Sequence, residues 1–205
     1  MDNKEYWTDY YKKHPNPVEP STFAKFCTGF LEENKSLIEL GCGNGRDSVY
    51  FAGKQVNVTA VDQVDEEMEY LNNKYEANNL KFVSEDFTNM GTDNSYDYVY
   101  SRFTIHSIDS EAETRVFNWI YNQLNKDGYF FLEVRSLNDP MFKKGEQISD
   151  TENITTHYRR YLDYEDTVEK LEKIGLNIIY KVESQGLAVY NDDDPTLIRL
   201  VAKKE

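Results

Sequence analysis

Three glycines at alternate positions follow a mostly apolar run in the first quarter of the chain. Gly41, Gly43 and Gly45 come directly after residues 37–40. Glycine lets the backbone turn sharply and take φ angles that a Cβ would forbid, so a ligand can lie against bare main chain. Residues 47–53 favour a helix whose first N–H groups point back at this turn. By itself the stretch fits a site for NAD, a site for another nucleotide, or a tight bend.

Acidic residues follow the next two predicted strands. Asp62 lies 21 residues after Gly41, where its carboxylate can accept hydrogen bonds from both hydroxyls of a ribose. The alternative role is a helix N-cap, for which Asp65 is better placed. Asp86 can accept a hydrogen bond from the exocyclic amine of an adenine, with Phe87 as an apolar neighbour, and the alternative is a solvated loop acid.

Basic side chains follow two later strands. The predicted strand 96–100 continues into Arg102 and His106, and the predicted strand 129–134 into Arg135. In open α/β sheets the ligand crevice lies outside the carboxyl ends of the strands. We therefore expect these side chains to line a pocket, with a helix-cap hydrogen bond as the alternative role of His106.

A polar stretch after the fifth strand is too long for an ordinary connection. We interpret residues 137–161 as a partly ordered active-site insertion that ends in the densest cationic cluster of the chain. The candidate site residues of this cluster are His157, Tyr158, Arg159 and Arg160. Pairing with neighbouring acids is the alternative role of the two arginines.

Hydrophobic periodicity supplies the elements that must position these residues. Strands alternate with helices, which predicts an α/β fold of the Rossmann-like, doubly wound kind with helices on both faces of a mostly parallel sheet. The last two strands lack an intervening helix, so we expect an antiparallel final strand. Residues 125–128 are interpreted as a helix stop followed by a turn. Strands are predicted at 37–40, 56–61, 80–84, 96–100, 129–134, 176–183 and 196–202, and helices at 6–11, 21–31, 47–53, 65–75, 116–124 and 163–174.

Aromatic residues recur at helical spacing near the N-terminus, before two prolines end the segment. This pattern fits either a terminal helix packed on the domain or a lid over a pocket, and we predict residues 1–20 to be a lid. The aromatic residues are Tyr6, Trp7, Tyr10 and Tyr11.

Composition limits the functional classes. The 205 residues, 39% of them hydrophobic, fit a single domain. The net charge of -14 opposes binding to a phosphate backbone, so no nucleic-acid partner is expected. Two cysteines are too few for a disulfide framework or a zinc site, and no metal is expected. No apolar stretch approaches a membrane span, so we expect a cytoplasmic monomer or homodimer without a membrane partner.

The order of these features resembles the class I S-adenosylmethionine-dependent methyltransferases. The resemblance covers residues 36–203, and the spacing GxGxG favours S-adenosylmethionine over NAD, whose enzymes carry GxGxxG. It implies a seventh strand inserted antiparallel beside the fifth. The segments 43–48, 101–106 and 157–161 are similar to those of compact bacterial small-molecule methyltransferases of surface-glycan and related biosynthetic clusters.

The resemblance also implies roles for the candidate residues, with S-adenosylhomocysteine as the product. The glycines admit the methionyl part of the cofactor, Glu39 orders their turn, Asp62 holds the ribose diol, and Asp86 and Phe87 meet the adenine. The complete set of expected cofactor-binding residues is Glu39, Gly41, Gly43, Gly45, Asp62, Gln63, Asp86, Phe87 and Ser101.

The acceptor follows from chemistry. The Asn/Asp-Pro-Pro-Tyr/Phe motif of amino and nucleobase N-methyltransferases is missing after the fourth strand, which favours an oxygen acceptor. A hydroxyl needs a base, for which His106 and His157 are the candidates, whereas an anionic acceptor is oriented by arginines. We predict methylation of a small phosphorylated or carboxylated metabolite, with an RNA or protein methyltransferase and a non-catalytic cofactor-binding regulator as alternatives. The expected acceptor-binding residues are Tyr11, Arg102, Arg135, Tyr158, Arg159 and Arg160.

Overall fold

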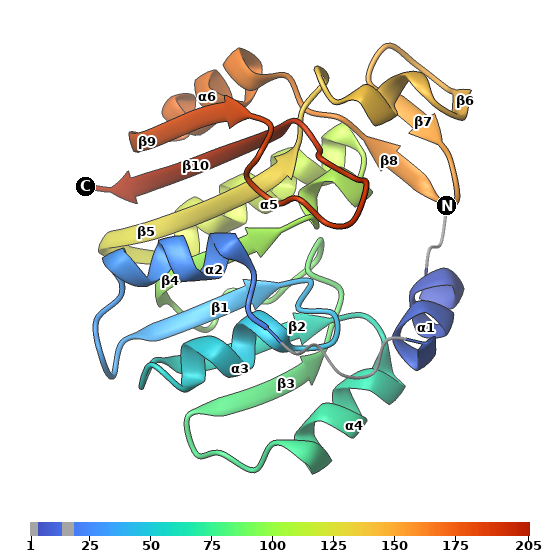
Figure 1. The fold of residues 1–205 in the computed structure, drawn as a ribbon. Helices are drawn as coiled ribbons and strands as arrows, with labels where there is room; N and C mark the ends of the chain where they lie inside the picture. The colour runs from blue at the N-terminus through green and yellow to red at the C-terminus, as the bar shows by residue number, and fades with distance from the viewer. Residues whose placement is uncertain (1–3, 14–18) are drawn as a thin grey trace.

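The computed structural model describes residues 4–13 and 19–205. Seven strands form one sheet in the order β3-β2-β1-β4-β5-β10-β9 (Figure 1). Neighbouring strands from β3 to β5 run parallel, whereas β10 is antiparallel to both β5 and β9. The predicted doubly wound sheet, with its final strand inserted antiparallel beside the fifth, is confirmed.

The helices and strands alternate along the chain as the periodicity predicts. The strands of the main sheet are β1 (Ser36–Leu40), β2 (Asn57–Asp62), β3 (Leu80–Ser84), β4 (Tyr96–Arg102), β5 (Leu124–Arg135), β9 (Leu176–Ser184) and β10 (Leu197–Lys204). The helices are α1 (Lys4–Lys13), α2 (Thr22–Cys27), α3 (Arg46–Ala52), α4 (Asp65–Lys74), α5 (Ser110–Gln123) and α6 (Tyr164–Lys173), with 3-10 turns η1 (Thr28–Phe30), η2 (Ile105–Ser107) and η3 (Pro140–Lys143).

The central strands are apolar on both sides because helices cover both faces of the sheet. Along β5, Phe130 and Leu132 pack into the cluster that contains α5 and α6, and Phe131 packs into the cluster that contains α2, α3 and α4. Figure 1 shows α2 and α3 in front of the sheet and α5 behind it. This burial holds the strand ends, and therefore the site, in fixed positions.

One local prediction is wrong. The N-cap position of α4 is Val64, and Asp65 is the first helical residue, where its carboxylate accepts hydrogen bonds from Ser84 and Lys4. The predicted helix stop and turn at 125–128 are present, because α5 ends at Gln123 and Asp127 has a φ of 64°. Leu124 pairs with Tyr96 and Tyr129 with Tyr98, so residues 125–128 bulge out of the pairing within the bounds of β5.

The insertion at 137–161 is more ordered than expected. It contains η3 and a three-stranded antiparallel sheet of β6 (Glu146–Gln147), β7 (Glu152–Ile154) and β8 (Tyr158–Arg160). Asn153 is fully buried and donates hydrogen bonds to the carbonyl oxygens of Phe142 and Lys144, which closes the segment on itself. Local hydrogen bonds thus supply order that hydrophobic periodicity does not reveal.

The aromatic helix α1 lies beside α4 and the insertion (Figure 1). Lys4 Nζ lies 3.0 Å from Asp65 Oδ2, and the rings of Tyr6 and Trp7 lie 4.5 and 5.2 Å from the ring of His157. The predicted lid segment at 1–20 also includes residues 1–3 and 14–18, which lie outside the described residues.

Candidate functional site

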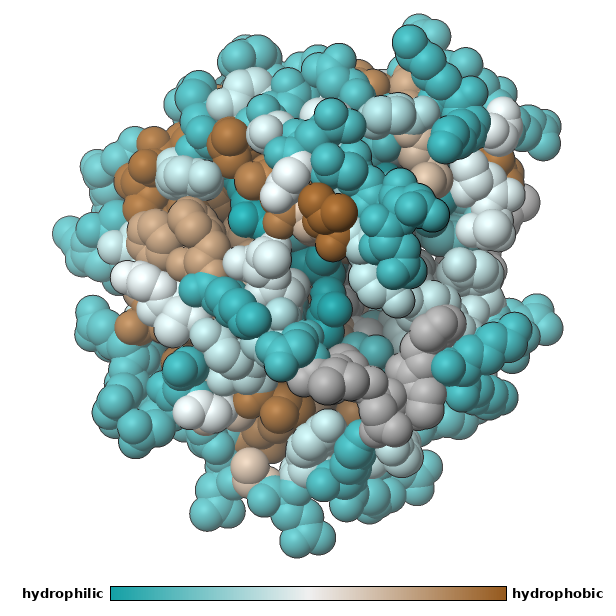
Figure 2. All heavy atoms as spheres, in the orientation of Figure 1, coloured by the Kyte–Doolittle hydropathy of each residue, from teal (hydrophilic) through white to brown (hydrophobic). Residues whose placement is uncertain are grey.

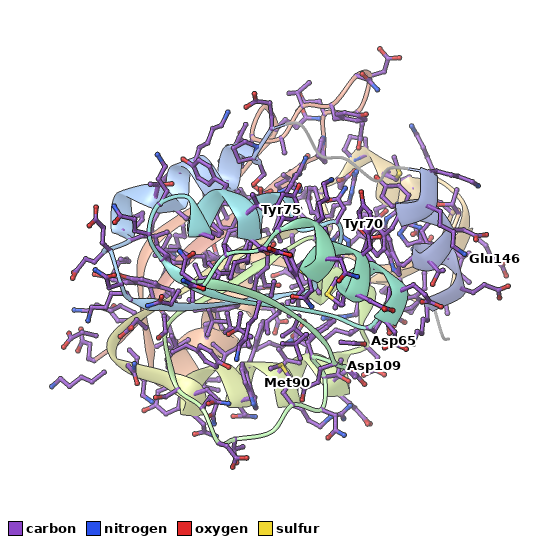
Figure 3. The ribbon with its side chains drawn as sticks, turned by 90° about the horizontal axis from the view of Figure 1, so that it is seen from below. Asp65, Tyr70, Tyr75, Met90, Asp109 and Glu146 are labelled. Carbon is purple, nitrogen blue, oxygen red and sulfur yellow. The ribbon has the colours of Figure 1, made fainter. Side chains whose placement is uncertain are left out.

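The carboxyl ends of the parallel strands meet at one end of the sheet. Viewed from below, Asp65 at the start of α4 and Asp109 at the N-cap of α5 mark this end (Figure 3). Because each parallel strand ends and its following loop begins here, residues far apart in the sequence come together.

The glycine turn takes the backbone conformation that the sequence requires. Gly41, Gly43 and Gly45 have φ angles of 70°, 55° and 75°, in the left-handed region. A Cβ on Gly41 would lie 2.6 Å from Thr104 Oγ1, and one on Gly45 would lie 2.7 Å from the ring of Phe82. Gly45 therefore serves packing against β3 and does not line the hollow described below, whereas Gly41 and Gly43 do.

Asp62 is the centre of a buried hydrogen-bond network. Its Oδ2 accepts from the backbone N–H of Gly43 at 3.0 Å and from the Tyr11 hydroxyl at 3.3 Å, and its Oδ1 accepts from the N–H of Val64 at 3.2 Å. Burial raises the pKa of Asp62, and burial together with the charge of Asp62 raises the pKa of Tyr11 well above its usual value. The network joins α1, the glycine turn and β2.

A second carboxylate network lies behind the turn. Glu39 accepts a hydrogen bond from the Ser48 hydroxyl, and burial raises its pKa well above the usual range, with the charge of Asp47 as the next cause. Asp47 accepts from Ser21 Oγ at 2.7 Å and from the Tyr100 hydroxyl at 2.8 Å. These bonds tie α2, α3 and β4 together, and the pattern analysis did not identify Asp47 or Ser21.

Two connected hollows lie along the strand ends. The first, of about 270 Å³, is lined by the carboxylates of Glu39, Asp47 and Asp62. The second, of about 420 Å³, shares Gln63 and Phe87 with the first. Together they form an elongated site that is acidic at the glycine turn.

The second hollow also contains Asp86 and Tyr158. Asp86 is exposed and accepts hydrogen bonds from the N–H and hydroxyl of Thr88, the pattern of a loop acid, and it lines the second hollow. The Tyr158 hydroxyl donates to Glu152, and its pKa is raised by burial and by this bond. Ser101 lines neither hollow, and its buried Oγ has no partner among the described residues.

A third cleft, of about 800 Å³, adjoins the first hollow on the other side. Arg135 lines it, and so does the loop between β9 and β10, which contributes Val189 and Tyr190. The residues shared by this cleft and the first hollow are Tyr10, Asn44, Arg46, Arg102 and Phe103. Of these, only Arg102 was predicted as an acceptor-binding residue. Arg46 was not predicted as a site residue, although its position directly after the last glycine places it beside the turn.

Arg102 belongs to a buried charge network. Its Nε donates to Glu133 at 2.8 Å, and Glu133, which is fully buried, also accepts from Arg199. Arg199 donates further to Thr22 Oγ1 and to the carbonyl oxygen of Leu187. One carboxylate thus faces two guanidinium groups.

Phe103 and His106 lie next to this network. Phe103 has a φ of 56°, an unusual angle for a bulky residue, and its ring stacks on Arg102 at 4.2 Å and on His106 at 5.6 Å. His106 is buried behind the ring and lines neither hollow nor the cleft. Burial, followed by the charges of Arg159 and Arg135, lowers its pKa well below the usual value.

The basic side chains at the end of the insertion each contact a different part of the structure. His157 packs on α1, and burial lowers its pKa to about 4. Arg159 donates to Thr155 Oγ1, and Arg160 pairs with the buried Glu113. Arg135, from β5, pairs with Asp139 and Asp193, which offset its charge. The two histidines therefore lie near Arg102, Arg135 and Arg159, whose charges act on His106, whereas Arg160 is taken up by Glu113.

Arg160 and Arg159 are neighbours with different contacts, which gives a stability prediction. Arg160→Gln removes a partner of a carboxylate that is 1% exposed and leaves Lys170 as its only described cation. We expect a loss of about 3 kcal/mol in the free energy of unfolding, measured by urea denaturation, because an uncompensated buried charge is costly. Arg159→Gln is the matched control, with an expected loss below about 1 kcal/mol. Equal losses would contradict the assignment of Arg160 to structure.

The chemistry of the hollows fits S-adenosylmethionine. The glycine turn lines the hollow with Gly41 and Gly43, and Asp62 beside it offers the carboxylate that a ribose diol needs. In the second hollow, Phe87 is an apolar neighbour for the adenine ring of the cofactor. With the strand order and the antiparallel β10, these features define a class I S-adenosylmethionine-dependent methyltransferase.

Comparison with known proteins identifies the family. A family model described as a methyltransferase domain matches residues 14–181, and the chain belongs to this family. No curated protein matches the sequence.

Solved structures share the fold. An S-adenosylmethionine-dependent methyltransferase from Methanosarcina mazei superposes with a TM-score of 0.75 at 16% identity, over 87% of this chain and 96% of that one. One from Clostridium acetobutylicum gives 0.72 at 19% identity, over 98% of both chains. The 1,6-didemethyltoxoflavin-N1-methyltransferase of Burkholderia thailandensis, with bound 1,6-didemethyltoxoflavin and S-adenosylhomocysteine, gives 0.73 at 17% identity, over 98% of this chain and 84% of that one.

The described residues include no helix that is both long and apolar enough to cross a membrane. They also contain no group of three or more histidine, cysteine, aspartate or glutamate side chains arranged to hold a metal ion.

Proposed function

We propose that this methyltransferase moves the methyl group of S-adenosylmethionine to an oxygen of a small anionic metabolite, phosphorylated or carboxylated. The observation that carries this proposal is the half-buried guanidinium group of Arg102 on the wall shared by the first hollow and the cleft. The volume of the cleft, about 800 Å³, suits a small metabolite. Sugars, nucleotides and surface-glycan precursors are candidate acceptors.

The described face of the molecule supports a small acceptor over a macromolecule. It is largely hydrophilic, with hydrophobic residues in separate small groups (Figure 2). The net charge of -14 also disfavours RNA. A protein acceptor and a non-catalytic regulator remain the alternatives, and the segment 101–106 after β4 favours oxygen over nitrogen because it lacks the Asn/Asp-Pro-Pro-Tyr/Phe motif.

The residues of the site position, and do not chemically activate, the reacting groups. The bound cofactor supplies an electrophilic methyl group on a sulfonium. Transfer then requires an oxygen held about 3 Å away on the axis of the breaking bond and protected from water. We propose that α1 supplies this protection as a lid, because Trp7, Tyr10 and Tyr11 all line the first hollow.

A binding measurement followed by an acceptor screen tests this function. We expect isothermal titration calorimetry to show binding of S-adenosylmethionine and S-adenosylhomocysteine but not of NAD. We then expect methyl transfer to members of a panel of carboxylated and phosphorylated metabolites, and none to matched neutral alcohols, amines or RNA. Turnover of the neutral compounds or RNA alone would overturn the anionic-acceptor proposal.

A further inference from the structure

The guanidinium group of Arg102 lies at the junction of the first hollow and the cleft, and its Nε donates to Glu133. Glu133 is shared with Arg199, and Asp47 is the next acid whose charge acts on Arg102. Arg199 donates its other hydrogen bonds to Thr22 and Leu187, and Asp47 accepts its own from Ser21 and Tyr100. The terminal nitrogens of Arg102 have no hydrogen-bond partner among the described residues. An anion bound there would supply acceptors for them.

The location of Arg102 determines which atom of such an anion reacts. Arg102 and Phe103 line both the cofactor hollow and the cleft, so an anionic group bound there lies where the two spaces meet. The part of the acceptor nearest the methyl donor is then the anionic group itself. A hydroxyl elsewhere on the molecule would lie farther into the cleft.

The surrounding groups provide no obvious base. Neither His106 nor His157 lines the first hollow or the cleft. The acids that do line them have partners: Glu39 bonds Ser48, Asp62 bonds Gly43, Asp193 pairs with Arg135, and Glu19 pairs with Lys25. An acceptor that is already ionised needs no base.

Three of the exposed side chains that line the cleft, beside charged ones, are apolar or aromatic. Val189 and Tyr190, in the loop between β9 and β10, are 60% and 74% exposed, and Tyr10 on α1 is 38% exposed. Figure 2 shows a small hydrophobic group over this loop, near the centre of the view. An acceptor with a flat apolar body would cover these side chains, whereas a sugar phosphate would not.

We infer that the acceptor is a small carboxylic acid with a flat apolar body, and that its carboxylate is both the group held by Arg102 and the nucleophile. This inference rests on the proposed function. One carboxylate oxygen forms the bond to the methyl carbon while the carbon–sulfur bond breaks, and that electron pair stays on sulfur. The products are a neutral methyl ester and S-adenosylhomocysteine, and no proton is transferred.

The second arginine of the junction has a different role. Arg46 directly follows the glycine turn, is only half buried, and lies 3.7 Å from Asp47 through its Nε. It is placed to pair with the carboxylate of the cofactor, whereas Arg102 pairs with the carboxylate of the acceptor. Substitution of Arg46 is therefore expected to weaken binding of the cofactor, and substitution of Arg102 to weaken binding of the acceptor.

The experiment uses the full chain, S-adenosylmethionine with a labelled methyl group, and benzoate, cinnamate and indole-3-carboxylate as acceptors. Benzyl alcohol and glucose 6-phosphate are the comparison acceptors. We expect product from at least one acid that releases labelled methanol in alkali, as methyl esters do and ethers do not. We also expect kcat/KM to stay level between about pH 5.5 and 8, because the pKa values of His106, His157 and the acceptor's carboxyl group all lie below this range.

Variants separate the two arginines. Arg102→Gln should lower kcat/KM for the acid about 100-fold and abolish its calorimetric binding in the presence of S-adenosylhomocysteine, with the Kd of S-adenosylmethionine within about threefold. Arg46→Gln should raise that Kd about tenfold or more. Lys173→Gln makes the same charge change on the exposed face of α6 and should alter neither kcat/KM for the acid nor the Kd of S-adenosylmethionine.

Each contrary result has a defined meaning. Alkali-stable product from phosphorylated acceptors, or failure of every acid to bind beside S-adenosylhomocysteine, overturns the inference and leaves the proposed function standing. Equal weakening of cofactor binding by Arg102→Gln and Arg46→Gln overturns the assignment of Arg102 to the acceptor. Failure of the wild-type chain to bind S-adenosylmethionine would overturn the proposed function itself.

Discussion

Replacing Asp62 with asparagine is expected to weaken binding of S-adenosylmethionine about 100-fold. Asp62 accepts from Gly43 and Tyr11 through one oxygen and from Val64 through the other. Asparagine has one acceptor oxygen and an NH₂ group, so one of these donors would face another donor. The loss of charge-assisted hydrogen bonds to a ribose is worth about 3 kcal/mol, which corresponds to the expected change in Kd.

Calorimetric titration with S-adenosylmethionine and S-adenosylhomocysteine measures this effect. Asp93→Asn is the matched control, since Asp93 is exposed in the loop between β3 and β4 and its substitution should leave both Kd values within about twofold. Thermal unfolding without ligand reports any general damage. An Asp62→Asn protein with its melting temperature preserved and cofactor affinity within threefold of wild type would exclude the ribose role.

Gly41→Ala is expected to destabilise the chain and to lower cofactor affinity together. The φ of 70° places the residue where an L side chain is strained by about 1 kcal/mol, and the new Cβ would also collide with Thr104. We expect a loss of about 2 kcal/mol or more in the free energy of unfolding and at least about tenfold weaker binding of S-adenosylmethionine. Urea denaturation and calorimetry measure the two effects.

A double variant separates collision from backbone strain. Thr104→Gly removes the colliding side chain, so in the Gly41→Ala background it should recover part of the stability, although alone it should cost stability. Gly29→Ala is the control, because an added Cβ there meets no atom within 4 Å and its φ is not positive. If Gly41→Ala behaves like Gly29→Ala, the turn does not depend on bare backbone at this position.

Local patterns were sufficient for the elements and for the identity of the cofactor. The order of strands, the glycine turn and the acid at the end of β2 all follow from periodicity and from residue types at fixed spacing, because each is a property of one continuous segment. The error at Asp65 arose where a contact from another strand outweighed the local signal.

Local patterns were not sufficient for the partners of charged side chains. The sequence predicted Arg160 and Arg135 equally as acceptor-binding residues. Only the fold shows that Arg160 pairs with Glu113 and that Arg135 pairs with two aspartates. The same holds for His106, which sequence placed in the crevice and the fold places behind Phe103.

The glycine spacing, the acids after the second and third strands and the strand order were therefore determined by the sequence itself, since short-range sterics and burial leave few alternatives for them. The tertiary structure decided which charges are neutralised, which aromatic residues form the cleft and which arginine stands at its junction with the cofactor hollow. Those outcomes depend on residues such as Glu133, Thr22 and Tyr190, which lie far apart along the chain and meet only when the sheet has formed. An ion pair between residues on different segments is a property of two positions in space, and neither segment alone encodes it.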